Sequence, residues 1–182
     1  MNRHVVDTNV LIVASGEHPD SPFASDRHPV EDAEQSEKVL NWLMDFEASV
    51  GRMVVDKDWA IIGEYQNKLT DQDYGQRVLF EKMSRSEIDY VDIEWVEDPA
   101  LPDTEKVARL EASLQPVIHD LADTKMVAAC FNANKSGMPC NIVNACDTDW
   151  YDWQEALEAE GVIVEQIIED WSREKWRAHH NR

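Results

Sequence analysis

The sequence has few positively charged residues for its length. Its 182 residues include 17 lysines and arginines against 37 aspartates and glutamates, which gives a formal net charge of −20 at pH 7. Proteins bind nucleic acid non-specifically through cationic side chains that displace counterions from phosphates. The composition therefore excludes binding of nucleic acid through the overall field of the protein. It leaves a local site, a divalent metal ion or a basic protein partner.

Cysteines and long apolar runs are also scarce. Three cysteines (Cys130, Cys140 and Cys146) are an odd number for a disulfide framework, and their spacing is unlike that of a paired zinc site. No apolar run approaches the roughly 20 residues of a membrane-spanning helix. Asp7 and Asn9 interrupt the apolar stretch near the N-terminus, which argues against a signal peptide. We therefore expect reduced thiols and a cytoplasmic protein without membrane segments.

Short apolar segments alternate with helical patterns along the chain. Buried strands are predicted at 4–6, 53–55, 141–146 and 162–164, with a half-exposed strand at 90–95. The spacing of apolar residues predicts helices at 10–14, 34–48, 56–69, around 78–83, 105–114, 116–133, 153–159 and 167–176. This alternation indicates one α/β domain over residues 1–182 with a mostly parallel central sheet. Residues 15–33 are expected to form a polar insertion, and 168–182 a C-terminal helix and basic tail.

Two aspartates follow predicted strands directly. Asp7 comes after the first strand, and Asp147 comes after the strand that ends at Cys146. In open parallel sheets, functional groups collect beyond the carboxyl ends of the strands, where a buried carboxylate is costly unless a cation meets it. One such aspartate can equally cap the following helix. Two at equivalent strand ends favour a site.

Further acidic residues lie on predicted helices. Glu64 borders an apolar helix face beside Ala60 and Ile61, although a surface glutamate is the simpler interpretation of this residue alone. Asp123 begins a helix of small apolar residues, and Asp120, three residues earlier, is expected on the same helical face. Few lysines or arginines stand nearby in the sequence, so this pair also requires a cation.

Four motifs resemble those of the PIN-domain nucleases. They are a strand followed by Asp7-Thr8-Asn9-Val10-Leu11, a helical glutamate in 61–65, an aspartate before an alanine-rich helix in 123–129, and a late strand leading to an aspartate and an aromatic residue in 142–150. Their order covers roughly residues 3–167. The resemblance implies a three-layer α/β/α sandwich and a small endonuclease, commonly a ribonuclease. Many members of the family are toxins of bacterial toxin–antitoxin pairs.

The resemblance also implies roles for individual residues. Asp7, Glu64, Asp123 and Asp147 match the catalytic acids that bind Mg²⁺ or Mn²⁺, with Asp149 as a further metal ligand and Asn9 and Asp120 as accessory residues. Carboxylate oxygens suit hard divalent cations, and such a cation activates a bound water for hydrolysis of a phosphodiester. Whether the site holds one metal ion or two is left open by the sequence. Two features depart from the family: Ala145 stands where a serine or threonine is common, and the 15–33 insertion is long.

The C-terminal segment is cationic within an acidic protein. Arg173, Lys175 and Arg177, together with nearby tryptophans, could guide a single strand of RNA or DNA by charge and stacking. The alternative, slightly favoured, is that these residues pair with the protein's own acids. A basic antitoxin-like partner and a homodimer are further expectations.

Three other interpretations of the sequence exist. His18, Asp20, Asp26 and His28 match no standard metal site, so a polar loop is expected there. An aspartyl-nucleophile phosphatase would need a second aspartate where Asn9 stands, because an amide cannot donate and regain a proton. The remaining rival is a non-catalytic PIN-like module that binds nucleic acid or protein. A broken acidic set would distinguish it from a metal-dependent endoribonuclease.

Overall fold

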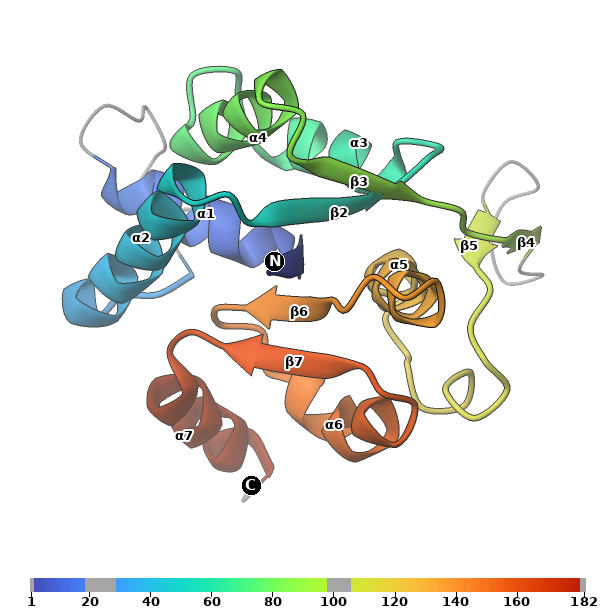
Figure 1. Cartoon of the computed structure of the whole chain (residues 1–182). Coiled ribbons are helices and arrows are strands. Elements are labelled where there is room, and N and C mark those ends of the chain that lie inside the picture. The colour runs from blue at the N-terminus through green and yellow to red at the C-terminus, as the bar shows by residue number, and fades with distance from the viewer. Residues whose placement is uncertain (1, 19–28, 98–105, 181–182) are drawn as a thin grey trace.

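The computed structural model describes residues 2–18, 29–97 and 106–180. Within these residues the chain forms a five-stranded, all-parallel sheet in the order β3-β2-β1-β6-β7 (Figure 1). The strands are β1 (Arg3–Val6), β2 (Arg52–Asp56), β3 (Ile88–Val91), β6 (Asn141–Asn144) and β7 (Ile163–Gln166). A separate antiparallel pair joins β4 (Trp95–Glu97) to β5 (Lys106–Ala108).

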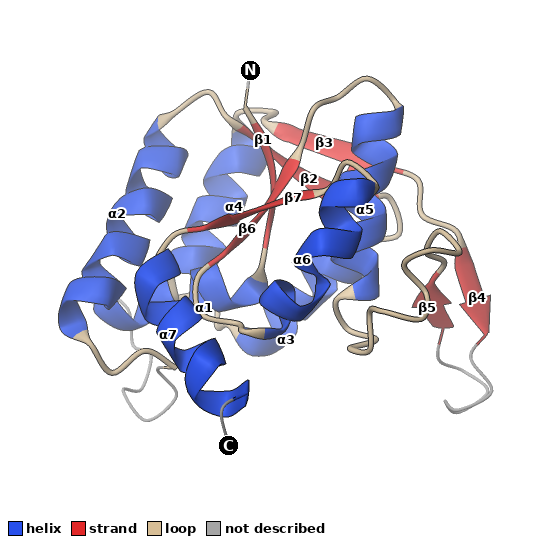
Figure 2. Cartoon of the chain, turned by 90° about the horizontal axis from the view of Figure 1, so that it is seen from below, coloured by secondary structure: helices blue, strands red, loops and turns tan. Residues whose placement is uncertain are grey.

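Helices cover both faces of the parallel sheet. The described residues contain α1 (Thr8–Glu17), α2 (Ala33–Ala48), α3 (Ala60–Lys68), α4 (Tyr74–Ser84), α5 (Thr124–Lys135), α6 (Asp149–Ala159) and α7 (Glu169–His180). Figure 2 shows α1, α2 and α4 on one side of the sheet and α5 and α6 on the other. The α/β class with a parallel sheet is confirmed, and the layering is consistent with the expected sandwich.

The central strands are apolar because both of their faces are covered. Val5, Val6, Val54, Ile142 and Val143 are completely buried. Such continuous apolar runs are typical of parallel strands with helices on both faces, where neither side of the pleat meets water. This burial explains why strands of only four or five residues could be recognised in the sequence.

The strand order creates a topological switch point between β1 and β6. From β1 the chain continues outward to β2 and β3, whereas from β6 it continues in the opposite direction to β7. Loops that leave the carboxyl ends of two such strands diverge, and the crevice between them is the usual ligand site of an open α/β sheet. The backbone N–H of Asp7 donates to the carbonyl of Val143 at 2.9 Å, which holds the two strand ends together.

Several predicted elements between residues 90 and 133 are wrong. The strand expected at 90–95 is divided between β3 and β4, and the helix expected at 105–114 is strand β5 followed by turns. Helix α5 begins at Thr124 rather than at Pro116. The Asp120 side chain accepts a hydrogen bond from the backbone N–H of Ala122 at 2.7 Å, and such local bonds compete with helix formation. Asp120 therefore lies in a turn before the helix, not on its face.

The two segments flanking the sheet were predicted with inexact bounds. Helix α1 continues through Glu17 and α2 begins at Ala33, so the insertion predicted at 15–33 is too long at both ends. Residues 19–28, which include Asp20, Asp26 and His28, lie outside the described residues. His18 stacks on Tyr74 with ring centroids 4.2 Å apart. Helix α7 spans Glu169–His180, whereas the apolar spacing predicted a helix at 167–176. Among the described residues, no helix has both the length and the apolar character needed to cross a bilayer.

Candidate functional site

Asp7 lies at the junction of β1 and α1, at the switch point of the sheet. It caps α1, because its Oδ1 accepts the backbone N–H of Asn9 at 3.1 Å. Its Oδ2 accepts the indole N–H of Trp150 at 2.7 Å. Burial, followed by the charge of Asp147, raises the pKa of Asp7 to about 7, although the two donated hydrogen bonds act in the opposite direction. Capping therefore accounts for part of this residue's environment but leaves its charge poorly compensated.

Asp147 is positioned by a network of two amide side chains, those of Asn144, which is buried, and Asn9, which is partly buried. The side chain of Asn144 donates to the carbonyl of Asp147 at 2.8 Å and accepts its N–H at 3.2 Å. Asn9 donates to Asn144 at 2.8 Å, and its own side-chain oxygen accepts the N–H groups of Ala145 and Cys146. The accessory role expected of Asn9 thus extends beyond Asp7, because its side chain fixes the loop that carries Asp147.

Asp123 immediately precedes α5 on the opposite side of the sheet from α1. The residue is 8% exposed, and its Oδ2 is buried without a hydrogen-bond partner among the described residues. Burial raises the pKa of Asp123 to about 9, assisted first by the charge of Asp7 and then by those of Asp120, Asp147 and Glu64. An unpaired buried carboxylate is unfavourable unless it binds a proton or a cation. This oxygen is the strongest indication of a missing positive charge.

Glu64 occupies α3 and meets a cation that the sequence did not reveal. Its Oε1 accepts a hydrogen bond from the hydroxyl of Thr8, and its Oε2 lies 2.5 Å from Nζ of Lys125. Both side chains of this ion pair are mostly buried, with 13% and 19% exposed. Glu64 therefore already has a cationic partner in Lys125, the second residue of α5.

Asp120 and Asp149 border the same group of acids. Their charges raise the pKa of Asp147, after the larger effect of burial, and the backbone N–H of Asp149 donates to Asp147 Oδ1 at 2.9 Å. Both side chains are exposed. They contribute negative charge to the acid site, a name used below for Asp7, Glu64, Asp123 and Asp147.

The acid site is not a closed cage for a metal ion. Among the described residues, no three histidine, cysteine, aspartate or glutamate side chains are already arranged around one ion position. Mg²⁺ does not require such a cage, because it keeps several waters and is commonly bound by one or two carboxylates together with substrate phosphates. Two carboxyl groups fit a cation that is held by few protein ligands. Asp123 has an oxygen without a hydrogen-bond partner among the described residues, and the pKa of Asp7 is raised.

The basic C-terminal helix is largely engaged with itself. Arg173 pairs with Glu169 at 2.5 Å, and the ammonium of Lys175 lies 4.2 Å from the ring centre of Trp171. No ion pair involves Arg177 within the described part of the chain. The substrate-binding role predicted for this segment therefore gains no support from its contacts, and internal pairing, the favoured alternative, is present for Arg173.

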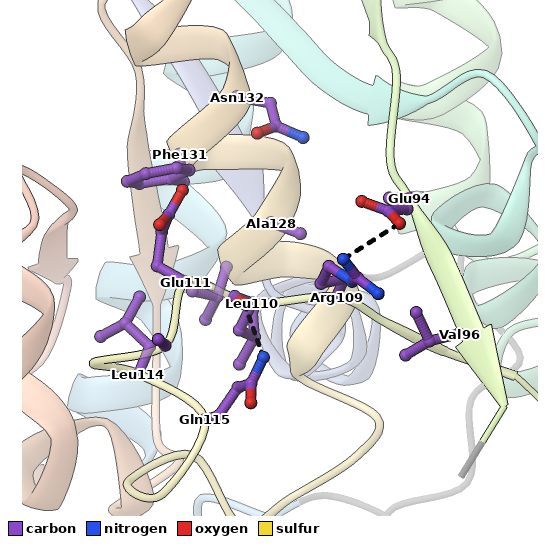
Figure 3. A pocket seen from close by; sticks show the side chains of 12 residues that line it. Glu94, Val96, Arg109, Leu110, Glu111, Leu114, Gln115, Ala128, Phe131 and Asn132 are labelled. Carbon is purple, nitrogen blue, oxygen red and sulfur yellow. Dashed lines mark hydrogen bonds and ion pairs between the residues drawn. The ribbon is translucent and has the colours of Figure 1, made fainter.

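A cavity of about 500 Å³ lies away from the acids. Figure 3 shows it between β4, the segment after β5 and the outer face of α5, with Arg109 paired to Glu94 at 3.3 Å. None of the predicted site residues lines it. Its lining combines apolar side chains with charges that already have partners, so it offers no group for catalysis.

Sequence reasoning missed four side chains that shape the acid site. Trp150 is completely buried, and its indole N–H binds Asp7. Thr8, Lys125 and Asn144 all lie within or beside the motifs that suggested the acids. The sequence shows that these residues are polar but does not show their partners. Thr8 bonds to Glu64, 56 residues away, and Asn144 bonds to Asn9, 135 residues away.

Scans of family models, curated proteins and solved structures found no match to this chain. The case for a function therefore depends on the residues and their geometry alone.

Proposed function

We propose that this protein is a metal-dependent endonuclease of PIN-like type that hydrolyses RNA. The observation that carries the proposal is the buried, unpartnered Oδ2 of Asp123, which faces the charges of Asp7 and Asp147 at the switch point of a parallel sheet. Asp7, Asp123 and Asp147 would hold Mg²⁺ or Mn²⁺. A cation of this kind supplies an activated water and stabilises charge on the phosphate.

The protein's own residues have distinct tasks in this proposal. Trp150 and Asn9 hold the carboxylate of Asp7 in one orientation, and Asn144 holds the backbone of Asp147. A site that keeps ligands in place before substrate binds loses little free energy to reorganisation during the reaction. Asp149 is proposed as an outer ligand because it is exposed beside Asp147.

One observation favours the alternative, a non-catalytic binding module. Lys125 already neutralises Glu64, so one of the four expected acids has a cation that belongs to the protein. In a module without catalysis, Lys125 would be a permanent substitute for a metal ion. In the nuclease, Lys125 would compete with the metal ion for Glu64, and the metal would depend mainly on the three aspartates.

The direct test is cleavage by purified protein. With Mg²⁺ or Mn²⁺, the wild-type protein is expected to cleave single-stranded RNA, and Asp123→Asn to reduce the rate by about 100-fold or more, because an electrostatic contact to the reacting centre is lost. Asp45→Asn, an exposed aspartate on α2, is the matched control and should cleave normally. Binding of Mn²⁺, followed by electron paramagnetic resonance, gives a second readout. Intact RNA with both metals, or equal cleavage by wild type and Asp7→Asn, would overturn the proposal.

We further propose that the enzyme acts as a toxin with a basic neutralising partner. The support is the net charge of −20, which favours association with a cationic protein surface. Expression in a bacterial host should arrest growth, and Asp123→Asn should relieve the arrest. Arrest that persists in the variant would contradict this role.

A further inference from the structure

A second cavity, of about 640 Å³, adjoins the acid site. It lies between α3, the β4–β5 hairpin and the start of α5, and the residues relevant here are Glu64, Asn67, Lys68, Trp95, Lys106 and Lys125. Figure 2 shows α5 next to the β4–β5 hairpin. We call this the lysine cavity.

The lining of the lysine cavity is positively charged, whereas the protein as a whole is strongly acidic. Three of the protein's 17 lysines and arginines line it, with one glutamate. Lys68 and Lys106 are exposed and have no acidic side chain within 4.0 Å among the described residues. Glu97 lies opposite Lys106 in the β4–β5 pair, and Asp58 binds the indole of Trp95. Within the described part of the chain, two lysines without an ion pair lie beside a third, which makes a local anion site in an acidic protein.

The lysine cavity is continuous with the acid site through one ion pair. Lys125 lies two residues beyond Asp123, and its ammonium contacts Glu64 and the carbonyl of Ala122 at 2.5 and 2.6 Å. Glu64 and Lys125 therefore belong to both places. An anion bound by the lysines is adjacent to the carboxylates at which we place the metal.

We propose that the lysine cavity binds the sugar–phosphate backbone of a single-stranded nucleic acid next to the phosphate that is cleaved. This inference rests on the proposed function for the position of cleavage, but the binding itself does not require catalysis. Lys68 and Lys106 neutralise phosphates, Lys125 donates a hydrogen bond while it stays paired with Glu64, and Trp95 supplies an aromatic ring for a base.

The aromatic and amide groups favour nucleic acid over an acidic protein segment. The indole N–H of Trp95 is held by Asp58 at 2.7 Å, which restricts the ring. Stacking of a base on such a ring strengthens binding about fivefold or more. Asn67 adds hydrogen-bonding groups that bases and sugars can use. An acidic peptide would meet the lysines equally well but would gain little from the ring.

The test compares two double variants that lose the same charge. Lys68→Gln/Lys106→Gln removes the exposed lysines of the cavity, and Lys38→Gln/Lys135→Gln removes exposed lysines that pair with Glu34 and Glu111 elsewhere. The probe is a short fluorescein-labelled single-stranded RNA, and anisotropy is measured over a range of salt concentrations in the Asp7→Asn background. The cavity variant should bind about tenfold more weakly, with a salt slope reduced by about 1.4, because each lost phosphate contact in a single strand contributes about 0.7. The control should bind like its parent.

A third variant identifies the class of ligand. Trp95→Leu should weaken binding of the RNA about fivefold or more and leave binding of a polyglutamate peptide unchanged. Equal weakening by both lysine pairs, or no weakening by the cavity pair, overturns the inference. So does tight binding of polyglutamate without binding of RNA. If wild-type protein fails to cleave yet binds RNA through Lys68 and Lys106, the nuclease proposal falls and the binding site stands.

Discussion

The side-chain nitrogen of Asn9 lies 2.8 Å from the side-chain oxygen of Asn144, although 135 residues separate them in the chain. Asn9 follows β1 and Asn144 ends β6, so this bond joins the two strands on either side of the switch point. Asn144 is completely buried and also binds the backbone of Asp147 and the side chain of Gln166. The relative positions of Asp7 and Asp147 depend on this pair of amides.

Asn144→Ala should lower the free energy of unfolding by about 2–3 kcal/mol. The substitution leaves buried donors of Asn9 and Asp147 without an acceptor, and each such group is costly. Asn141→Ala, in the same strand but without a side-chain hydrogen bond in the described structure, should cost less than about 1 kcal/mol. Urea unfolding followed by circular dichroism measures both. Equal destabilisation by the two variants would show that the amide network contributes little.

Trp150→Phe should move the acidic limb of the pH–rate profile to higher pH. The phenyl ring retains most of the packing, but Asp7 loses a hydrogen bond that stabilises its charged form, so its pKa rises further above about 7. Trp153→Phe is the control, because Trp153 is equally enclosed and packs edge-on against Trp150. Rates of RNA cleavage at several pH values report the shift. An unchanged profile would remove Trp150 from the positioning of Asp7.

Lys125→Met should tighten metal binding by about tenfold, because Glu64 would then lack its competing cation. Lys135→Met is the matched control on the same helix, where the ion pair with Glu111 is exposed and distant from the acids. Titration of Mn²⁺ in the absence of RNA separates this effect from the loss of a phosphate contact. Unchanged or weaker metal binding in Lys125→Met would contradict competition for Glu64 and favour Lys125 as a structural cation.

Stability of the metal-free protein should fall as pH rises from about 5 to about 7. The pKa values of Asp7 and Asp123 are raised from 3.8 to about 7 and about 9, so the folded state holds more protons than the unfolded state throughout this range. Each such group lowers the free energy of unfolding by about 1 kcal/mol per pH unit above its unfolded pKa, until its folded pKa is reached. Urea unfolding at several pH values measures the slope.

The Asp123→Asn variant is a control for the measurement of stability against pH. Asp123→Asn cannot ionise at this position, so its slope should be shallower and it should be more stable than wild type near neutral pH without divalent metal. Added Mg²⁺ should flatten the slope of the wild type more than that of the variant, because a bound cation replaces the protons. A wild-type stability that increases between these pH values would show that the carboxyls are compensated by other groups.

The pattern of apolar residues predicted helices and strands well where one or both faces of the element pack against the core. Residues 4–6 and 53–55 fall within β1 and β2, and 34–48 lies within α2, because apolar periodicity follows directly from which faces are covered. The prediction failed at residues 90–97 and 106–123, where the described chain forms an antiparallel strand pair and turns. There the apolar residues cover α5 rather than forming a continuous layer, so their spacing has no single period.

The sequence by itself determined that acids follow two central strands and that a strand–helix alternation builds a parallel sheet, because both depend on neighbouring residues. Only the tertiary structure decided that β1 pairs with β6, that Oδ2 of Asp123 has no hydrogen-bond partner among the described residues, and that Lys125 reaches Glu64. These contacts join segments far apart in the chain, and their geometry is set by how the helices pack on the sheet. The lysine cavity also depends on the tertiary structure, since its residues come from three separate parts of the chain that only folding brings together.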